Sequence, residues 1–360
     1  MEEFVKVSNL MAGDQIARTI YNDDFKVLLA KGNRLTASGI NAIKGISLKG
    51  CYIEHDNPIR REQIPLSEPL VNEDEKIAFI KQIKELFANK IIFDNPFEPA
   101  FKVQRKHIED MTRELIRHLR ARFNENKFLY ETEDYTRTFK NWIYHHTFNT
   151  CLLSTGIAMT LGYNAKTIEE IAIGALYHDL GKASFGPDLY NKENADEADK
   201  VILRKHPEIM FRILQKLSYP VNTTYAVWQH HEKTGGQGYP VGLTKDRIAM
   251  SAQIVGLASA FDNLVTVQAY SRTPMNQIDA LEYLQGCGLY SIECIRALFE
   301  FIVPYPIGSK VLLSNDDVGY VLKNTKSVIM RPYVISKKRL YDLAQDESCR
   351  NITVIKVLEN

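Results

Sequence analysis

Cysteine is scarce in this chain, and its positions do not form a redox or zinc motif. The five cysteines are scattered, and no two have the C-x-x-C spacing of a zinc knuckle or a disulfide oxidoreductase. Their odd number and wide separation favour reduced thiols that are buried in the core. The cysteines therefore point to neither a disulfide framework nor a cysteine-based metal site.

Long apolar runs and an excess of one charge are also absent. No run approaches the roughly 18 apolar residues that a membrane span needs. The N-terminus, MEEFVKVSNL, lacks the basic region and apolar stretch of a signal peptide. Lys and Arg number 45 against 44 for Asp and Glu, which gives a net charge of +1 and no sign of a nucleic-acid polymer or a membrane as partner. We expect a soluble, cytoplasmic protein.

The pattern of apolar residues predicts a mainly α-helical protein with a small β-rich unit at each end. The 360 residues, 45% of them hydrophobic, provide enough material for two or three domains. We expect four segments: a β-rich domain at 1–60, a linker and helical connecting region at 61–136, a helical bundle at 137–303, and a β-rich subdomain at 304–360. The connecting region could also serve in dimerisation.

Individual elements follow from turn residues and periodicity. Thr36 can cap a short helix that runs to Ile46, and Gly181 can end an apolar helix over Ile168–Tyr177. Amphipathic helices are expected over 73–90, where Ile77, Ile80, Ile83 and Phe87 recur at helical spacing, and over 102–123, and an apolar helix over 249–267. Strands are expected at Phe25–Ala30, Gly50–Glu54, Lys310–Leu313, Gly319–Leu322 and Ser327–Met330, and a linker at Asn57–Pro69.

Histidines cluster in the predicted bundle in a fixed order. Six of the nine lie between 145 and 231, in the order H…HD…H…HH, with a glycine-rich loop directly after. Imidazole and carboxylate together are suitable ligands for iron, manganese or zinc. An adjacent His-Asp pair, such as His178-Asp179, can serve two metals if the carboxylate bridges them, and two metals can hold both oxygens of a phosphoryl displacement. The isolated residues His55, His107 and His118 are interpreted as packed or solvated side chains instead.

These motifs resemble the HD-GYP family, a branch of the HD phosphohydrolases. The resemblance depends on His146, then HDLGK at 178–182, HPE at 206–208, HHE at 230–232 and GYP at 238–240. It covers roughly residues 140–275, and extends more weakly to the N-terminal β unit and to the segment at 305–311. It implies a helical HD-domain bundle and a phosphodiesterase that opens cyclic di-GMP to linear pGpG, and in some members cuts on to GMP, through a metal-activated hydroxide.

The resemblance also implies roles for individual residues. The first metal would be bound by His146 and His178, Asp179 would bridge, and the second metal would be bound by His206, His230 and His231. Lys182 would face a substrate phosphate and act with Asp179 in catalysis, and Gly238 and Tyr239 would line the substrate loop. His145 should point away from the site. Two divalent ions are expected, iron or manganese in preference to zinc. The expected partners are cyclic di-GMP or a related nucleotide, a GGDEF-type or other signalling protein, and a second copy of the chain in a homodimer.

The chain departs from the family pattern at several positions. Ser259 stands where the family has an aspartate ligand for the first metal, and Asp262, one turn further along the same predicted helix, is the candidate substitute ligand. Gln268 replaces an arginine, Gly235 an aspartate and Met210 a glycine. Trp142 replaces the glutamate that binds a third metal in some relatives, so we expect at most two metals. Losing one carboxylate should weaken the first metal site and slow hydrolysis.

Two functions from different classes therefore remain open. The HDxGK, HHE and GYP elements favour a phosphodiesterase. Ser259 and Gln268 favour a catalytically degenerate sensor or adaptor that binds a nucleotide or a partner protein without turnover. A third alternative keeps the chemistry but changes the substrate to another phosphate ester or nucleotide, because related folds share chemistry more widely than specificity.

Overall fold

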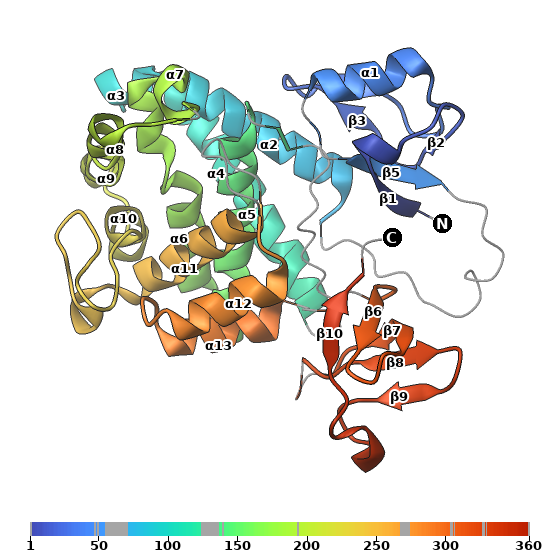
Figure 1. Ribbon diagram of the computed structural model, residues 1–360. Coiled ribbons are helices and arrows are strands. Elements are labelled where there is room, and N and C mark those ends of the chain that lie inside the picture. Colours follow the sequence, from blue (N-terminus) through green and yellow to red (C-terminus); the bar gives the residue numbers. More distant parts are fainter. Residues whose placement is uncertain are drawn as a thin grey trace. The chain divides into compact units, whose positions relative to one another are not determined.

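The computed structural model describes residues 2–46, 48, 50–54, 71–123, 137–138, 140–192, 194–266, 274–302, 305, 307–325, 328 and 330–358. The chain divides into two compact units (Figure 1). One unit contains residues 1–70, 125–138 and 302–360, and the other contains 71–124 and 139–301. The second unit is a helical bundle, whereas the described strands with a named sheet partner lie in the first. The predicted fold class is confirmed, and the linker predicted at Asn57–Pro69 falls outside the described residues.

The N-terminal part of the first unit is built on two small antiparallel sheets. Its three-stranded sheet has the order β1-β5-β2, and a second sheet pairs β3 with β4. The ranges are Glu2–Lys6 for β1, Gln15–Ile16 for β2, Ile20–Tyr21 for β3, Val27–Leu29 for β4 and Gly50–Glu54 for β5. Helix α1 (Ala37–Gly45) begins after Thr36, whose hydroxyl accepts the N–H of Gly39 at 3.1 Å. The predicted cap is thus confirmed.

The C-terminal part forms a five-stranded antiparallel sheet of order β10-β6-β7-β8-β9. Its strands are β6 (Lys310–Leu313), β7 (Val318–Lys323), β8 (Tyr333–Ser336), β9 (Leu340–Asp342) and β10 (Val354–Val357). The first two confirm the sequence prediction. The strand predicted at Ser327–Met330 is wrong in its described part, because the N–H of Arg331 donates to the carbonyl of Val328 at 2.9 Å and closes a turn there. Pro332 follows this turn, and the next strand begins only at Tyr333.

Helix α5 (Trp142–Thr160) lies in the interior of the helical unit. Nearly all of its side chains are buried, as expected of a helix that is apolar on every face. It contacts five other helices: α2 (Glu73–Ala88), α4 (Pro99–Arg122), α6 (Ala165–Tyr177), α11 (Met250–Val265) and α13 (Ile292–Phe301). Because α5 carries His146, the packing of these helices fixes the position of that imidazole.

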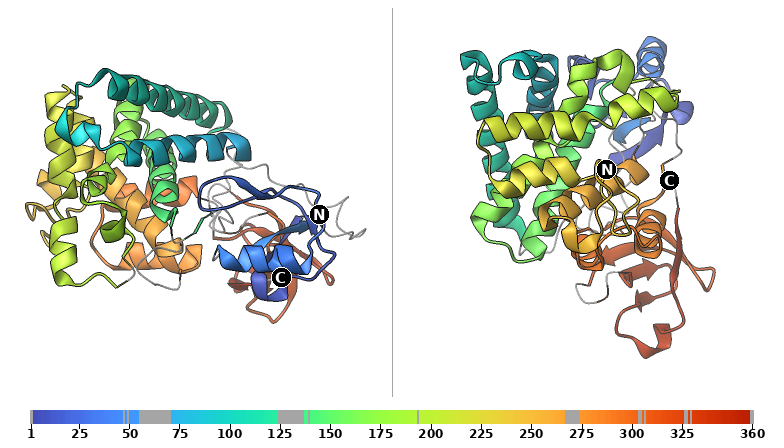
Figure 2. Two further views of the ribbon diagram at one scale, coloured as in Figure 1. Left: turned by 90° about the horizontal axis from the view of Figure 1, so that it is seen from above. Right: turned by 90° about the vertical axis from the view of Figure 1, so that its left-hand side faces the viewer.

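The predicted connecting region is helical and packs onto the bundle. Its longer helices, α2 and α4, run beside each other in the left view of Figure 2, and both contact α5. The apolar face predicted for α2 is confirmed, since all four of its spaced apolar residues are buried: Ile77, Ile80, Ile83 and Phe87. A short helix, α3 (Ile91–Asp94), joins them. The proposed division of the chain into four segments stays a prediction, but these contacts place residues 71–123 in the helical unit.

Shorter helices complete the unit and bring their ends to one region. They are η3 (Leu180–Phe185), α7 (Pro187–Tyr190), α8 (Glu197–Leu203), α9 (His206–Lys216), α10 (Val221–Gln229), η4 (Lys245–Arg247) and α12 (Gln277–Gly286). Among the described helices, none has the length and apolar character to cross a membrane.

Two glycines allow close backbone contacts at these helix ends. A Cβ on Gly181 would lie 2.2 Å from the carbonyl oxygen of His206, and one on Gly256 would lie 2.4 Å from that of His230. Gly181 was predicted to end α6, but α6 ends at Tyr177 and Gly181 lies inside η3. Its small size is needed for the approach of α9 instead, because any side chain would displace the backbone of His206.

We predict that Gly256→Ala destabilises the protein by about 1–3 kcal/mol, the usual penalty for overpacking. The added methyl group meets the backbone of His230, which cannot move without shifting its imidazole. The matched control is Gly286→Ala, also in a helix, where a Cβ meets nothing within 4 Å. Urea unfolding should show a lower free energy for the first variant only. Equal stability of both variants would contradict the close packing of α11 against His230.

Candidate metal centre

Three histidines stand at helix ends and are oriented by the carbonyl groups there. The Nδ1 atoms of His178, His206 and His230 lie 2.7, 2.6 and 2.7 Å from the carbonyl oxygens three residues earlier, in Ala175, Leu203 and Val227. Carbonyls in the last turn of a helix lack an intrahelical partner and are therefore available to accept. Because a carbonyl can only accept, each Nδ1 must carry the proton. Each Nε2 is thus left with a lone pair that can bind a metal.

His146 is oriented by a carboxylate instead of a carbonyl. Its Nδ1 lies 2.6 Å from Oδ2 of Asp262, and the amide of Asn149 donates to the other carboxylate oxygen at 2.7 Å. All three residues are buried. The Nε2 of His146 points the other way, 3.3 Å from Nε2 of His178 and 3.3 Å from the hydroxyl of Ser259. Asp262 therefore orients His146 through its Nδ1, the nitrogen that faces away from His178 and Ser259.

This position corrects the suggestion that Asp262 replaces the missing aspartate ligand. Asp262 belongs to neither of the potential metal-binding groups found among the described residues. One turn of helix separates it from Ser259, and that turn carries its carboxylate past the imidazole of His146 to the Nδ1 side. Spacing of three on a helix places two residues on one face, but it does not decide which edge of a neighbouring ring each one meets.

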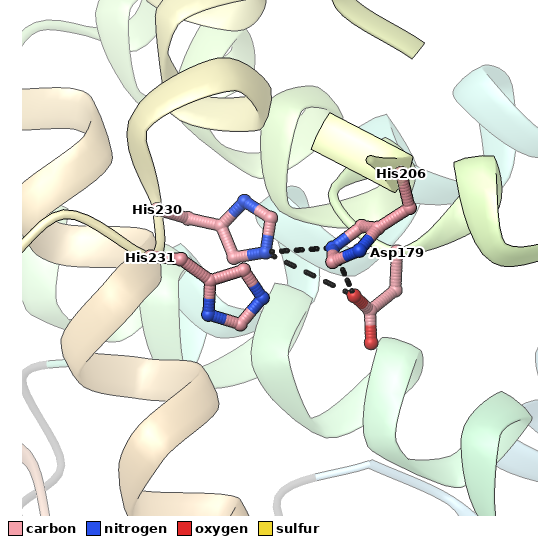
Figure 3. Close-up of side chains that lie close together, drawn as sticks. All are labelled: Asp179, His206, His230 and His231. Carbon is pink, nitrogen blue, oxygen red and sulfur yellow. Dashed lines mark hydrogen bonds and ion pairs between the residues drawn. The ribbon is translucent and has the colours of Figure 1, made fainter. Parts of the chain in front are cut away.

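The carboxylate of Asp179 lies between two groups of histidines. Its Oδ1 is 3.1 Å from Nε2 of His206 and 3.8 Å from Nε2 of His230. Its Oδ2 is 3.7 Å from Nε2 of His146 and 3.5 Å from Nε2 of His178. Figure 3 shows the group beside Oδ1, with the imidazoles of His206, His230 and His231 gathered beside Asp179. Each oxygen thus faces a separate set of nitrogen ligands.

The two groups have the composition and spacing of metal sites. One is formed by Asp179, His206, His230 and His231 and the other by His146, His178 and Asp179; within each, the ligand atoms lie within 4.8 Å of one another. The Nε2 atoms of His206 and His230 are 3.4 Å apart. Two nitrogens bound to one ion at about 2.1 Å lie roughly 3 Å or slightly more apart, which matches this spacing.

A cation would also satisfy groups that have no other partner. The lone pairs on Nε2 of His206 and His230 face each other, because both Nδ1 atoms already carry the proton. The buried Nε2 of His231 has no hydrogen-bond partner within the described part of the chain. Buried polar atoms are rarely left unpaired. The residues present therefore fit divalent ions, and iron, manganese and zinc all suit a set of imidazoles and one carboxylate.

The protonation states also suit metal binding. Burial lowers the pKa of His178 to about 3 and also lowers the pKa values of His206, His230 and His231, so these imidazoles are neutral near pH 7. Burial alone would raise the pKa of Asp179, but the Lys182 ammonium and the adjacent histidines hold it well below its usual range. Metal ligands must be deprotonated to bind, and this site meets that condition without a metal.

Comparison with known proteins agrees with this geometry. Residues 128–289 match the family model described as HD domain. This part of the chain is therefore similar to HD domains. A cyclic di-GMP phosphodiesterase of Pseudomonas aeruginosa is 24% identical over 201 residues, 55% of this chain and 48% of that protein. A cyclic di-GMP phosphodiesterase of Thermotoga maritima is 32% identical over 162 residues, 44% of each chain. The chain thus spans about half the length of these relatives.

A solved structure is also similar. It is described as an HDG"Y"P protein of Bdellovibrio bacteriovorus, shares 18% sequence identity, and matches with a TM-score of 0.49 over 83% of this chain and 98% of that one. The match to the HD-domain model and the cyclic di-GMP phosphodiesterase relatives confirm the resemblance to the HD-GYP family predicted from the sequence.

The positions at which the chain departs from the family pattern have different surroundings. Ser259 is buried beside Nε2 of His146, so its hydroxyl faces the smaller group of ligands. The indole N–H of Trp142 donates to Asn191 at 2.9 Å, and Met210 is fully buried. The three atoms nearest to a Cβ on Gly235 would all belong to the side chain of Gln237. Gln268 lies outside the described residues, and His145 is buried but belongs to neither group of ligands.

The glycine-rich loop is held by Glu232, a residue to which the sequence interpretation gave no role. Its carboxylate accepts the N–H groups of Val241 and Leu243 at 2.8 Å and that of Gly242 at 3.0 Å. A Cβ on Gly238 would lie 2.4 Å from Cα of Glu232, so this glycine is required for packing of the loop on the HHE turn. A carboxylate followed closely by a glycine-rich loop was the available sequence signal, because successive N–H groups in such a loop bind anions.

The candidate metal centre opens into a cavity of about 690 Å³. His206, His231 and Ser259 line it from the metal side, and Tyr239, whose ring stacks on His231 at 4.4 Å, lines it from the loop. Four cationic side chains also line it: Lys182, Lys200, Arg204 and Lys233. Gly238, which was predicted to line the substrate loop, is not among the lining residues. A cavity of this size suits a ligand of several hundred cubic ångströms, and its cations favour an anion.

We predict that the metal-free protein loses stability as the pH falls from about 7 to 5. The buried histidines stay neutral in the folded state, whereas unfolded histidine takes up a proton below about pH 6.5. The unfolded state therefore binds more protons in this window, and stability falls with pH until the folded pKa, about 3 for His178, is reached. Each such histidine contributes a slope of up to about 1.4 kcal/mol per pH unit.

Urea unfolding of chelator-treated protein at pH 7, 6 and 5 measures this slope. Asp179 contributes only at lower pH, because its pKa is depressed from an already acidic value. His107→Gln, which removes an exposed histidine on α4, is the control and should keep the wild-type slope. A free energy of unfolding that is constant from pH 7 to 5 would show that the buried histidines do not stay neutral.

Proposed function

We propose that this chain is a metal-dependent phosphodiesterase that hydrolyses cyclic di-GMP to linear pGpG, GMP or both. One observation carries the proposal: the two oxygens of Asp179 face two separate histidine groups at the wall of a cation-lined cavity. The names of the similar proteins from P. aeruginosa and T. maritima supply the substrate class. A phosphodiester is an anion, and the cavity offers the cationic side chains that such a substrate needs.

In this proposal the two groups hold one divalent ion each, iron or manganese. His146 and His178 bind the first, His206, His230 and His231 bind the second, and Asp179 bridges. When bound, a pair of ions supplies Lewis-acid activation of water and of the phosphodiester oxygens. The protein contributes fixed imidazole orientations, through the Nδ1 contacts to carbonyls and to Asp262.

Lys182 has two tasks in this scheme. Its Nζ donates to Oδ2 of Asp179 at 2.6 Å, which stabilises the buried carboxylate and helps to hold it in the bridging position. The same side chain lines the cavity, where its ammonium can face a substrate phosphate. Tyr239 offers a ring face beside His231, on which a nucleobase can stack. Lys182 thus joins the metal centre to the substrate pocket.

The two ions are not held equally. The second group has three imidazoles and one carboxylate, whereas the first has two imidazoles and the shared carboxylate. Ser259, at the position of the family's aspartate, is neutral near pH 7 and is a poor substitute for a carboxylate. We therefore expect the second site to fill first, and hydrolysis to depend on how fully the first one fills.

The alternative function is a sensor or adaptor that binds the nucleotide, or a partner such as a GGDEF-type protein or a second copy of the chain, without turnover. Ser259 favours it, because a weakly held first ion lowers catalytic power. A different phosphate ester as substrate is a third alternative. Metal content and hydrolysis of cyclic di-GMP, measured together on anaerobically purified protein, separate these alternatives.

We predict that Asp179→Ala abolishes tight binding of both ions, because the carboxylate is shared by the two groups. Affinity for each should fall by more than about 100-fold, beyond the 10–100-fold typical of residues outside the ligand shell. Metal analysis after dialysis gives the result, with His107→Ala as a control that should keep the wild-type content. Equal metal content in the wild type and Asp179→Ala would disprove the bridging role.

A second prediction concerns the weaker site. Ser259→Asp should add a carboxylate beside Nε2 of His146, raise metal stoichiometry from about one toward two, and increase hydrolysis of cyclic di-GMP. Asp262→Asn should have the opposite effect and weaken the first ion by about 10–100-fold, because it disturbs only the support of His146. Metal titration of the wild type and both variants, with turnover measured beside each, provides the test.

The outcomes of this titration distinguish the proposals. Restored metal without hydrolysis in Ser259→Asp would favour the adaptor. Full occupancy by two ions in the wild type and in Asp262→Asn alike would contradict the unequal sites described above.

A further inference from the structure

Lys233 and Tyr290 form a polar pair in the wall of the cavity, apart from the metal ligands. The ammonium of Lys233 donates to the phenol oxygen of Tyr290 at 2.6 Å and lies 4.1 Å from the centre of its ring. Both side chains line the cavity. The pair is separated by 57 positions in the sequence, so no sequence motif reveals it.

Contacts between two loops hold this pair in place. Directly after Lys233, the hydroxyl of Thr234 donates to the carbonyl of Gly288 at 2.8 Å, and its N–H donates to that of Leu289 at 3.2 Å. The loop that follows the HHE turn is thereby tied to the loop between α12 and α13, which carries Tyr290. The pair is consequently fixed by backbone contacts and needs no ligand to form.

The charge of Lys233 has no counter-charge beside it among the described residues. No carboxylate lies within ion-pair distance of it in the part of the chain that the structure describes, although the side chain is partly buried. A cation that is partly removed from water gains from an anionic partner. By contrast, Lys182 is paired with Asp179, and Lys200 with Glu197 at 2.7 Å. Of the three cavity lysines, Lys233 is therefore the one without a carboxylate within ion-pair distance among the described residues.

The phenol of Tyr290 completes a site for an anion. Its oxygen accepts from Lys233, so its own O–H is left to donate to a ligand, and the ammonium has two further N–H groups. Three donors on two fixed side chains suit a phosphate group, whose oxygens only accept. A neutral base would use fewer of these donors and would leave the charge of Lys233 uncompensated.

We propose that Lys233 and Tyr290 form a second anion subsite, which binds the phosphodiester group of a dinucleotide that does not lie at the metal centre. The inference rests on the proposed function, and it narrows the substrate class to molecules with two phosphates. Such a substrate reaches from the metal centre to this pair, whereas a substrate with one phosphate occupies the metal centre alone.

The test measures binding of cyclic di-GMP to chelator-treated protein, which cannot turn the ligand over through metal chemistry. Lys233→Met should weaken binding by about tenfold or more, as expected when a charge-assisted hydrogen bond is lost. Tyr290→Phe, which removes only the hydroxyl, should weaken it less but measurably. Lys216→Met is the matched control: it removes an exposed lysine at the end of α9 and should bind as the wild type does. Thermal unfolding of each variant shows that it is folded.

Two further measurements decide what the pair recognises. If it binds phosphate, Lys233→Met should weaken cyclic di-AMP by the same factor as cyclic di-GMP, and should reduce the salt dependence of both. With metal restored, turnover of bis(p-nitrophenyl) phosphate, which has one phosphate, should fall by a smaller factor than turnover of cyclic di-GMP. A loss confined to cyclic di-GMP would assign the pair to guanine and overturn the proposal. A parallel loss with the one-phosphate substrate would place Lys233 at the reacting group and overturn it equally.

Failure of the proposed function gives a different result. A wild type that binds cyclic di-GMP through Lys233 but never hydrolyses it would support the subsite and the adaptor alternative together. A wild type that binds neither dinucleotide would overturn the subsite itself.

Discussion

The carboxylate of Asp179 is the charge around which this site is arranged. It is buried among four imidazoles, and burial lowers the pKa values of three of them, those of His178, His206 and His230, so that these three are neutral near pH 7. Neutral rings do not compensate a buried anion, and a single cation, that of Lys182, contacts it among the described residues. The remaining lone pairs, on both carboxylate oxygens and on the facing Nε2 atoms, all favour further positive charge. This arrangement therefore destabilises the folded protein when no cation is bound, and bound cations stabilise it strongly.

Helix ends make this arrangement possible. A carbonyl in the last turn of a helix has no partner along its own helix, so it can fix an imidazole three residues later without breaking a backbone hydrogen bond. Three elements use this device, at His178, His206 and His230. Glycines then let the backbones of neighbouring elements approach closely enough for the rings to meet, as at Gly181 and Gly256. The motif HDLGK thus combines a candidate metal ligand, a candidate bridging carboxylate, a contact glycine and a counter-charge in five consecutive positions.

Local order was the part of the structure that the sequence predicted best. The cap at Thr36, the apolar face of α2 and the strand Gly50–Glu54 depend on neighbouring residues, and all were found as expected. The ordered histidines likewise identified the region that converges. The ring edge that Asp262 meets was not predictable, because it depends on how α11 is rotated against α5. Nor was the pairing of Lys233 with Tyr290, which depends on how two distant loops meet.

The contacts that orient His146 bear on whether the weaker of the two proposed metal sites still functions. Asp262 and Asn149 are both buried, and their contacts hold His146 with its Nε2 directed at the site. A buried carboxylate is expensive unless it is well hydrogen-bonded, and an apolar residue of similar size would fill this space at less cost. The fold alone therefore does not require Asp262. The contact of Asp262 with His146 is useful if the imidazole must present the lone pair of its Nε2 to an ion. This holds even though Ser259, on the Nε2 side, supplies no charge. In the proposed function, the first site thus keeps its orientation and lacks one ligand, which is the arrangement expected of a weak metal site rather than of one that has been filled in by packing.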